Sequence, residues 1–158
     1  MSNIEINNLT EVKVNQKTIK EIIIQVLEEE KRKKKNLSVA FVGVGRIKKL
    51  NKKYRNKNRV TDVLAFPENE VEFGKFQIKG LKRTKSLGEI VVCLRQVKKN
   101  SHRLKTPFEE ELVRVLIHGT LHLLGYDHEK GSQEAIKMKE KEEKYLNKIK
   151  PPILSSIF

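Results

Sequence analysis

The sequence has few of the residues that build disulfide-linked, membrane-spanning or aromatic-rich proteins. Its 158 residues include one cysteine and no tryptophan. Cys93 therefore cannot form an intramolecular disulfide, and its apolar neighbours indicate an inert buried thiol. No run approaches the roughly 18 apolar residues of a membrane helix, and residues 1–5 do not resemble the start of a signal peptide. We therefore expect a cytoplasmic protein that has no membrane partner.

Acidic residues are absent from 31–59, where 13 lysines and arginines occur. Across 31–105 there are 23 basic and 5 acidic residues, a net charge of +18, and the rest of the chain carries −4. Such an asymmetric charge favours a polyanionic partner, above all nucleic acid. A lysine-rich solvated surface is the alternative. No RNA-recognition signature accompanies the charge, so the charge alone leaves the partner undecided.

Apolar periodicity predicts four strands, at 4–8, 37–42, 61–66 and 87–94. The last strand is nearly continuous in apolar residues, which is typical of a central position in a sheet. Between the first two strands, a capping box at Thr18–Glu21 predicts a helix that ends in the cations of 31–35. A short basic helix follows the second strand and turns three residues inward, namely Ile47, Leu50 and Tyr54.

The rest of the chain contains one long connection and two further helices. Residues 68–86 are polar and punctuated by glycine, with a loose hairpin at 73–78. Thr106 caps a buried helix that has Pro107 at its first position. Ser132 caps a last amphipathic helix that ends before two prolines. Because the chain shows neither an internal repeat nor an interdomain linker, we predict one domain over 1–150 and a C-terminal tail at 151–158.

Three of the four histidines fall within eleven residues, at His118, His122 and His128. Their i, i+4 spacing places His118 and His122 on one face of a helix. Gly125 sits where that helix would end, because glycine adopts the left-handed cap conformation without strain, and the turn can return His128 to the other two. Three converging imidazoles with an open fourth position are typical of a catalytic zinc site. Histidines that merely hydrogen-bond within a core are the alternative.

The offsets match the zincin pattern H-E-x-x-H-x-x-G-x-x-H, except that Gly119 occupies the position of its glutamate. That glutamate is the general base of a metalloprotease, and glycine cannot accept a proton. Peptide hydrolysis is therefore disfavoured, and another metal-assisted hydrolysis is indicated. Apolar residues cover most of this helix apart from a polar stripe that we expect to face the site, made of Glu111, Arg114, His118 and His122.

With these motifs, the chain resembles the YbeY family of bacterial rRNA maturation factors, which are metal-dependent single-strand endoribonucleases. Residues 118–128 match the family signature H-G-x-L-H-L-x-G-Y-D-H at every fixed position. A second family segment is matched by 50–57 and 61–67, and 87–91 fit the family strand G-[DE]-I. The connection at 68–86 is longer than in the family. Three positions also depart from the usual residues, namely Asn58, Val60 and Ala65.

The resemblance implies a single-domain α+β fold in which a small mixed sheet packs against a buried metal-carrying helix and flanking helices. It also implies one Zn²⁺ per chain on His118, His122 and His128, and a functional arginine at Arg55. The implied function is cleavage of single-stranded RNA in 16S rRNA 3′-end maturation and in ribosome quality control. The implied partners are rRNA and the small ribosomal subunit, together with a small-subunit ribosomal protein and an assembly GTPase.

Two residues are candidates for catalysis beside the metal. Arg55 could stabilise negative charge on phosphate oxygens bidentately, and a plain phosphate contact or a salt bridge is the alternative. Asp127 could orient a histidine ligand, although aspartate is also common in turns. Glu89 and Asp62 are weaker candidates for site carboxylates. We expect His102 at the surface.

Two other functions stay open. A metal hydrolase acting on a peptide or a small molecule is disfavoured by Gly119 and by the basic centre of the chain. A non-catalytic ribosome-assembly factor with a structural zinc site would need a fourth protein ligand. Neither Cys93 nor His102 has a suggestive spacing for that ligand.

Overall fold

A computed structural model describes residues 2–68, 86–149 and 154–158 of the chain. In chain order, its strands and helices are β1 (Ile4–Asn8), α1 (Gln16–Glu29), β2 (Asn36–Phe41), α2 (Val44–Arg55), β3 (Val63–Pro67), β4 (Ser86–Val92), α3 (Leu94–Leu104), α4 (Phe108–Leu123) and α5 (Ser132–Ile149). The chain also forms the 3-10 turns η2 (His128–Lys130) and η3 (Leu154–Ser156). The predicted hairpin at 73–78 lies outside the described residues.

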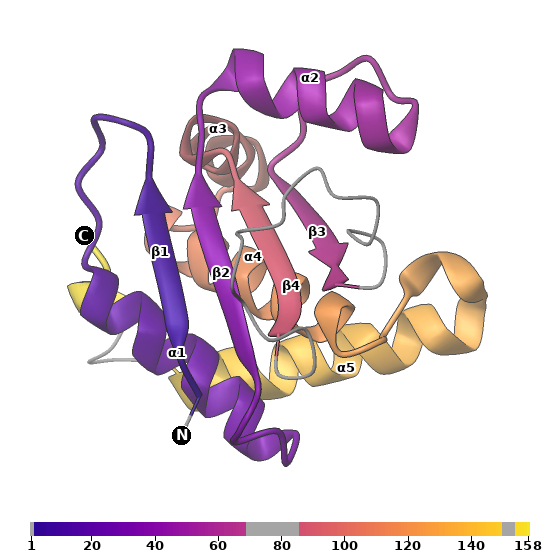
Figure 1. The fold of residues 1–158 in the computed structure, drawn as a ribbon. Coiled ribbons are helices and arrows are strands. Elements are labelled where there is room, and N and C mark those ends of the chain that lie inside the picture. The colour runs from indigo at the N-terminus through magenta and orange to yellow at the C-terminus, as the bar shows by residue number, and fades with distance from the viewer. Residues whose placement is uncertain (1, 69–85, 150–153) are drawn as a thin grey trace.

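The strands form a mixed sheet in the order β1-β2-β4-β3 (Figure 1). Strands β1, β2 and β4 run parallel, and β3 pairs antiparallel with β4. The predicted central position of β4 is confirmed. Side chains alternate between the two faces of the sheet. Ile90 and Val92 therefore join the main core, whereas Val91 joins a smaller cluster on the opposite face.

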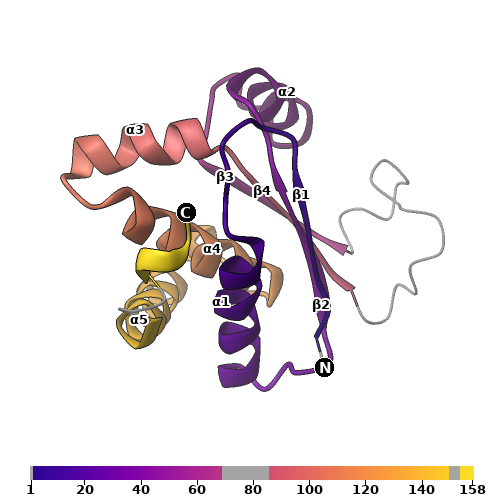
Figure 2. The same cartoon turned by 90° about the vertical axis from the view of Figure 1, so that its left-hand side faces the viewer.

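The two faces of the sheet are covered unequally. Helices α1, α4 and α5 lie on one side and enclose the main core, as the edge-on view shows (Figure 2). Helix α2 lies on the other face near the end where the parallel strands finish, and it inserts Ile47, which is fully buried. This is the single-domain α+β architecture that the resemblance implies. None of the helices in the described ranges is both long enough and apolar enough to cross a bilayer.

The last residues of the chain pack onto the domain. Ile157 is fully buried, and its carbonyl accepts a hydrogen bond of 2.8 Å from the amide of Asn15. The ring of Phe158 stacks on Phe108 at a centroid distance of 4.5 Å. Residues 154–158 therefore close one end of the core between α1 and α4.

Helix α1 begins before the predicted capping box. Asn15 is its N-cap, and the Asn15 side chain accepts a hydrogen bond from the Thr18 amide at 3.2 Å. Thr18 lies inside the helix and is buried. The predicted cap is therefore wrong, because Asn15 provides an equally good cap three residues earlier. The helix ends at Glu29, so the cations of 31–35 follow the helix instead of closing it.

The starts of α3 and α4 also differ from the predictions. The sequence patterns do not predict α3, because its first residue, Leu94, is assigned to the strand at 87–94 and no side chain caps the helix. Helix α4 begins at Phe108, with Pro107 in an extended conformation at the N-cap position. The Thr106 hydroxyl donates to Glu111 instead, at 3.4 Å. The predicted Thr106 cap is therefore wrong by one residue.

Gly88 lies where β4 passes β3 at very close range. Its φ is +129°, and a Cβ at this position would be 2.1 Å from the Phe66 carbonyl oxygen. Both the backbone conformation and the space therefore require glycine. The glycine of the G-[DE]-I strand is therefore required by the close approach of β4 to β3.

We predict that Gly88→Ala lowers the free energy of unfolding by at least about 2 kcal/mol, because backbone strain and atomic overlap each cost about 1–3 kcal/mol. Gly45→Ala is the matched control, since a Cβ there meets nothing within 4 Å. The control should be neutral or stabilising by up to about 1 kcal/mol. Urea denaturation of both variants measures the difference. Equal midpoints would contradict the close approach of the two strands.

Candidate metal centre

Helix α4 ends in a left-handed glycine turn that determines where His128 lies. The Gly125 amide donates to the His122 carbonyl and the Tyr126 amide donates to the Leu121 carbonyl, both at 3.1 Å. These two bonds define a Schellman motif, and the φ of Gly125 is +104°. The glycine stop predicted from the sequence is therefore confirmed.

The turn returns His128 to the face of α4 that carries His118 and His122. The ring centroids of His118 and His128 are 5.4 Å apart, and those of His122 lie 6.4 Å from His118 and 6.3 Å from His128. All three rings line one cleft of about 240 Å³. The structure thus brings together the three histidines that the sequence singles out.

The three imidazoles fit a zinc-like ion by chemistry, and their spacing is slightly wide. No three His, Cys, Asp or Glu side chains in the described ranges already stand in metal-binding geometry. Zn–N bonds of about 2.1 Å around a tetrahedral ion place ring centroids about 5 Å apart. The pair His118 and His128 is near this spacing, whereas the ring of His122 lies further from both.

His122 is held in the neutral form that binds metals. Burial and the neighbouring charge of His118 lower the pKa of His122. Its Nδ1 is buried and has no hydrogen-bond partner among the residues that the structure describes. An unsatisfied buried nitrogen is uncommon in folded proteins. None of the described protein groups therefore uses the hydrogen-bonding or metal-binding capacity of the His122 Nδ1 atom.

Helix α5 supplies the carboxylate that orients His118. Nδ1 of His118 is hydrogen-bonded to Oε1 of Glu142, whose side chain is only 13% exposed. Metal-binding histidines commonly donate their second ring N–H to a carboxylate, which fixes the tautomer and the ring orientation. Glu142 could not be singled out from the sequence, because one glutamate in a helix rich in lysine and glutamate carries no distinguishing pattern.

The residues on either side of this glutamate tie α5 to the turn and to α4. Lys141 forms an ion pair of 3.1 Å with Glu30, which also accepts a hydrogen bond from the Tyr126 hydroxyl at 3.2 Å. Glu143 pairs with Arg114 of α4. These contacts hold the segment that carries His128 against α1 and α5.

Gly119 packs against the sheet and does not face the cleft. A Cβ at this position would be 2.8 Å from Cγ2 of Ile90 on β4. Helix α4 therefore approaches the sheet this closely because residue 119 has no side chain. The position that carries the glutamate in zincin metalloproteases points into the core here, so a longer side chain could not reach a metal from it.

Only half of the predicted polar stripe reaches the cleft. Glu111 is 5% exposed, and burial raises the pKa of its carboxyl. Arg114 lies beside it and pairs with Glu143. The prediction that the stripe faces the site is therefore wrong for Glu111 and Arg114, because the first turns of α4 lie under α3 and α5.

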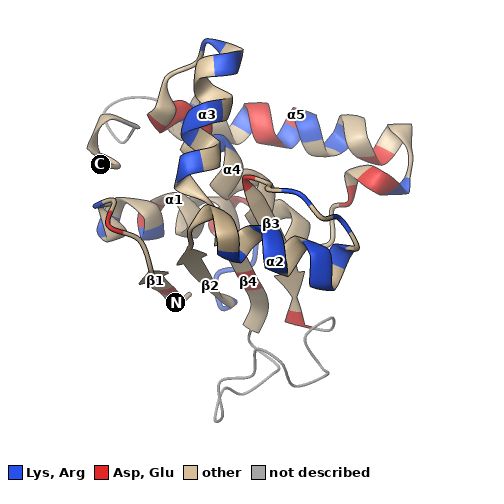
Figure 3. Cartoon of the chain, turned by 90° about the horizontal axis from the view of Figure 1, so that it is seen from above, with Lys and Arg blue, Asp and Glu red and all other residues tan. Residues whose placement is uncertain are grey.

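Basic side chains line the cleft together with the histidines. Arg55, Lys57 and Arg59 line it, and Figure 3 shows how Lys and Arg gather on α2. Asn51 holds the loop after α2: it is 3% exposed, and its side-chain amide donates to the Arg59 carbonyl at 3.0 Å. The cations of 31–35 lie elsewhere, and Arg32 borders a separate hollow beside the Gly125 turn. The basic centre of the sequence is therefore split between two places.

Arg55 is fixed in the cleft wall by the backbone and by an aromatic ring. Its Nη2 donates to the Ala65 carbonyl at 2.7 Å, and its guanidinium carbon lies 5.1 Å from the centroid of Phe66. These contacts orient the guanidinium plane relative to the three histidines. Arg55 thus lies in the same cleft as the predicted metal ligands.

The other candidates fall in three different places. Asp127 lies beside the cleft and accepts a hydrogen bond from the Glu129 amide at 2.9 Å, which caps η2. Asp62 lines the cleft, and its carboxylate is 3.3 Å from the Asn100 side chain. Glu89 points to the opposite face of the sheet, and His102 is exposed on α3. Asp62 is therefore the one of the two weaker candidates that lies at the cleft.

The fold and the cleft together define a class, namely α+β proteins that carry three histidines and several cations in one cleft. The family described as Endoribonuclease YbeY matches this chain over residues 3–150. The protein named Endoribonuclease YbeY of Thermodesulfovibrio yellowstonii is 45% identical over 117 residues, which are 73% of this chain and 67% of that protein. The protein of the same name from Persephonella marina is 37% identical over 136 residues, covering 85% and 84%.

A solved structure supports the same assignment. The solution structure of TM1509 from Thermotoga maritima has a TM-score of 0.61 and 32% sequence identity, and the match covers 92% of this chain and 88% of that one. The chain therefore belongs to the Endoribonuclease YbeY family.

Proposed function

We propose that this chain is a zinc-dependent endoribonuclease that cuts single-stranded RNA, with one zinc ion held by His118, His122 and His128. Family membership supports the endoribonuclease role. The observation that carries the proposal is the cleft itself, which is lined by three histidines together with Arg55, Lys57 and Arg59. Imidazoles suit a zinc ion, and the cations suit the phosphates of the substrate.

Each part of the cleft has a distinct task in this proposal. A bound zinc ion would supply Lewis-acid chemistry toward water and phosphate oxygens. Glu142 orients His118, and burial keeps His122 neutral. Arg55 stabilises the charge that grows on the non-bridging oxygens during cleavage. Asp127 caps the turn that carries His128 and so positions a ligand without touching the substrate.

We propose rRNA as the substrate, cut during maturation of the 16S 3′ end and in ribosome quality control. The resemblance of residues 118–128 to the family signature and the net charge of +14 support this choice. The small subunit, one of its proteins and an assembly GTPase are the proposed partners.

A non-catalytic assembly factor with a structural zinc is the second candidate. A structural site is closed by four protein ligands. Here the side chain of His118 is 28% exposed, and the rings line an open cleft. The open cleft favours the catalytic proposal.

Cleavage of a labelled single-stranded RNA by zinc-loaded protein tests the proposed function. The matched control is His122→Ala, purified identically so that contaminating ribonucleases are equal. We expect cleavage by the wild type and none above background by the variant. Equal cleavage by both preparations would contradict the proposal.

We predict about one zinc ion per chain, and metal affinity should fall 10–100-fold in Glu142→Gln because the variant loses the carboxylate that orients His118. Glu140→Gln, on the exposed face of the same helix, is the matched control. Competition with a chromophoric chelator measures affinity. His118→Ala combined with His128→Ala should abolish binding. Undiminished metal content in that double variant would refute the ligand assignment.

We predict that Arg55→Ala slows single-turnover cleavage of bound RNA by 10²–10³, about 3–4 kcal/mol, and changes RNA affinity little. Arg55→Lys should recover only part of the rate, because an ammonium lacks the planar fork. Arg59→Ala in the same cleft is the control for general electrostatics. Zinc content and thermal melting exclude misfolding. A variant that cleaves bound RNA at the wild-type rate would remove Arg55 from catalysis.

A further inference from the structure

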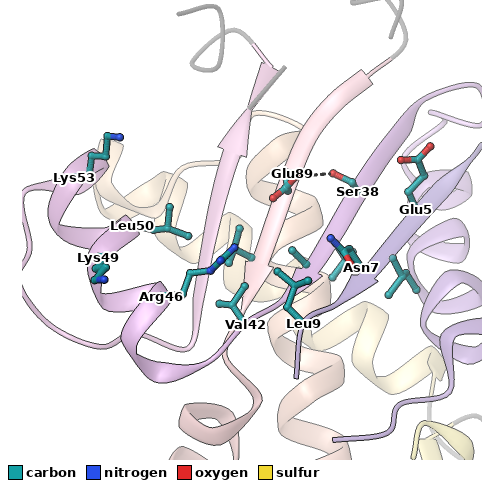
Figure 4. A pocket seen from close by; sticks show the side chains of 14 residues that line it. Glu5, Asn7, Leu9, Ser38, Val42, Arg46, Lys49, Leu50, Lys53 and Glu89 are labelled. Atoms are coloured by element: carbon teal, nitrogen blue, oxygen red, sulfur yellow. Dashed lines mark hydrogen bonds between the residues drawn. The ribbon is translucent and has the colours of Figure 1, made fainter. Parts of the chain in front are cut away.

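The face of the sheet that carries α2 has a second hollow, which we call the sheet groove. It has a volume of about 730 Å³ and lies between α2 and the strands β1, β2 and β4. Figure 4 shows its walls: Arg46, Lys49 and Lys53 come from α2, and Glu5 stands across the strands from them. None of the three histidines of the cleft lines the sheet groove.

The α2 wall of the sheet groove presents cations in a row. Arg46, Lys49 and Lys53 are spaced i, i+3 and i+7, which places them along one helix face. All three are exposed. In the described part of the chain, Arg46 and Lys49 form no ion pair. Three cations repeated about one helical turn apart suit a ligand that carries several negative charges along its length.

The floor of the sheet groove is apolar and holds one carboxyl group. Val42, Val91 and Leu50 form its apolar part. Glu89 lies beside Ser38, and its Oε2 accepts a hydrogen bond of 3.1 Å from the Ser38 hydroxyl (Figure 4). Burial raises the pKa of the Glu89 carboxyl, while the Ser38 hydroxyl acts in the opposite direction. The floor can thus contact a flat apolar ring whose edge carries N–H groups.

We propose that the sheet groove binds a segment of single-stranded RNA that continues from the RNA in the histidine cleft. Phosphates contact Arg46, Lys49 and Lys53, and a base lies over the apolar floor with its N–H groups toward Glu89. This inference rests on the proposed function. It adds a second RNA-binding site outside the cleft where cleavage occurs.

Two observations favour RNA over a protein ligand. Helix α2 contains six basic and no acidic residues, and it ends at Arg55, so one helix borders both the cleft and the sheet groove. An acidic peptide would meet Glu5 and Glu89, and a basic peptide would meet the α2 wall. RNA carries phosphates and base N–H donors together and matches both walls.

Binding of 2′-O-methyl RNA to zinc-loaded protein tests the proposal, with a denaturing gel confirming that the RNA stays intact during each titration. Fluorescence anisotropy gives Kd for oligomers of about 4 and about 12 nucleotides across a range of salt concentrations. The groove variant combines Arg46→Gln with Lys49→Gln. Its matched control combines Lys48→Gln with Lys52→Gln, which remove the same charge from α2 at exposed positions outside both hollows.

We expect the groove variant to flatten the salt slope of the longer RNA by about 1.4 and to weaken its binding roughly tenfold at 0.15 M salt, because two phosphate contacts are lost. The control variant should change both the salt slope and the affinity for the longer RNA much less. Methyl NMR signals of Val42 and Leu50 should shift when the longer RNA is added to the wild type. Cleavage of the shorter RNA in its 2′-hydroxyl form should stay at the wild-type rate in the groove variant.

Equal slopes in the groove variant and its control, with unshifted methyl signals, would overturn the sheet groove as an RNA site. The proposed function would survive that result as long as the wild type still cleaves RNA, and a protein ligand drawn to Glu5 and Glu89 would then become the occupant to test. A wild type that neither binds nor cleaves RNA would overturn both proposals.

Discussion

The left-handed turn at Gly125 is the constraint on which the site depends. A helix can place His118 and His122 on one face, but it cannot bring a residue six positions further on to the same point. Two backbone hydrogen bonds and one positive φ reverse the chain and deliver His128 to the cleft. The contacts of Tyr126 with Glu30, and of Glu30 with Lys141, then hold that turn against two other helices.

The site depends also on the close packing of helix α4 against the sheet. Gly119 lets the helix approach Ile90, and this approach fixes which face of α4 turns toward the cleft. The same packing explains how one histidine spacing serves different chemistries. The residue after the first histidine faces the core here, so a base for peptide hydrolysis has no place, and Arg55, Lys57 and Arg59 line the cleft instead.

Much of the architecture could be predicted from the sequence, because its signals are local. The four strands follow apolar runs, and the glycine stop follows from the conformational freedom of one residue. The positions that escaped prediction depend on contacts distant in sequence. Glu142 meets His118 from 24 positions away, Asn51 is recognisable only by the loop that it holds, and Glu89 could be assigned to a face only once the register of β4 was known. Helix α3 escaped prediction because its first residue, Leu94, continues the apolar run of the preceding strand and no side chain caps the helix.

The central claim is that three histidines hold a zinc ion whose fourth position stays open to the substrate. X-ray absorption at the zinc edge of the loaded protein measures this most directly. We predict a first shell of three imidazole nitrogens and one oxygen from solvent, with one imidazole lost in His128→Ala. A sulfur in the shell, a fourth protein ligand, or a shell unchanged in His128→Ala would contradict it.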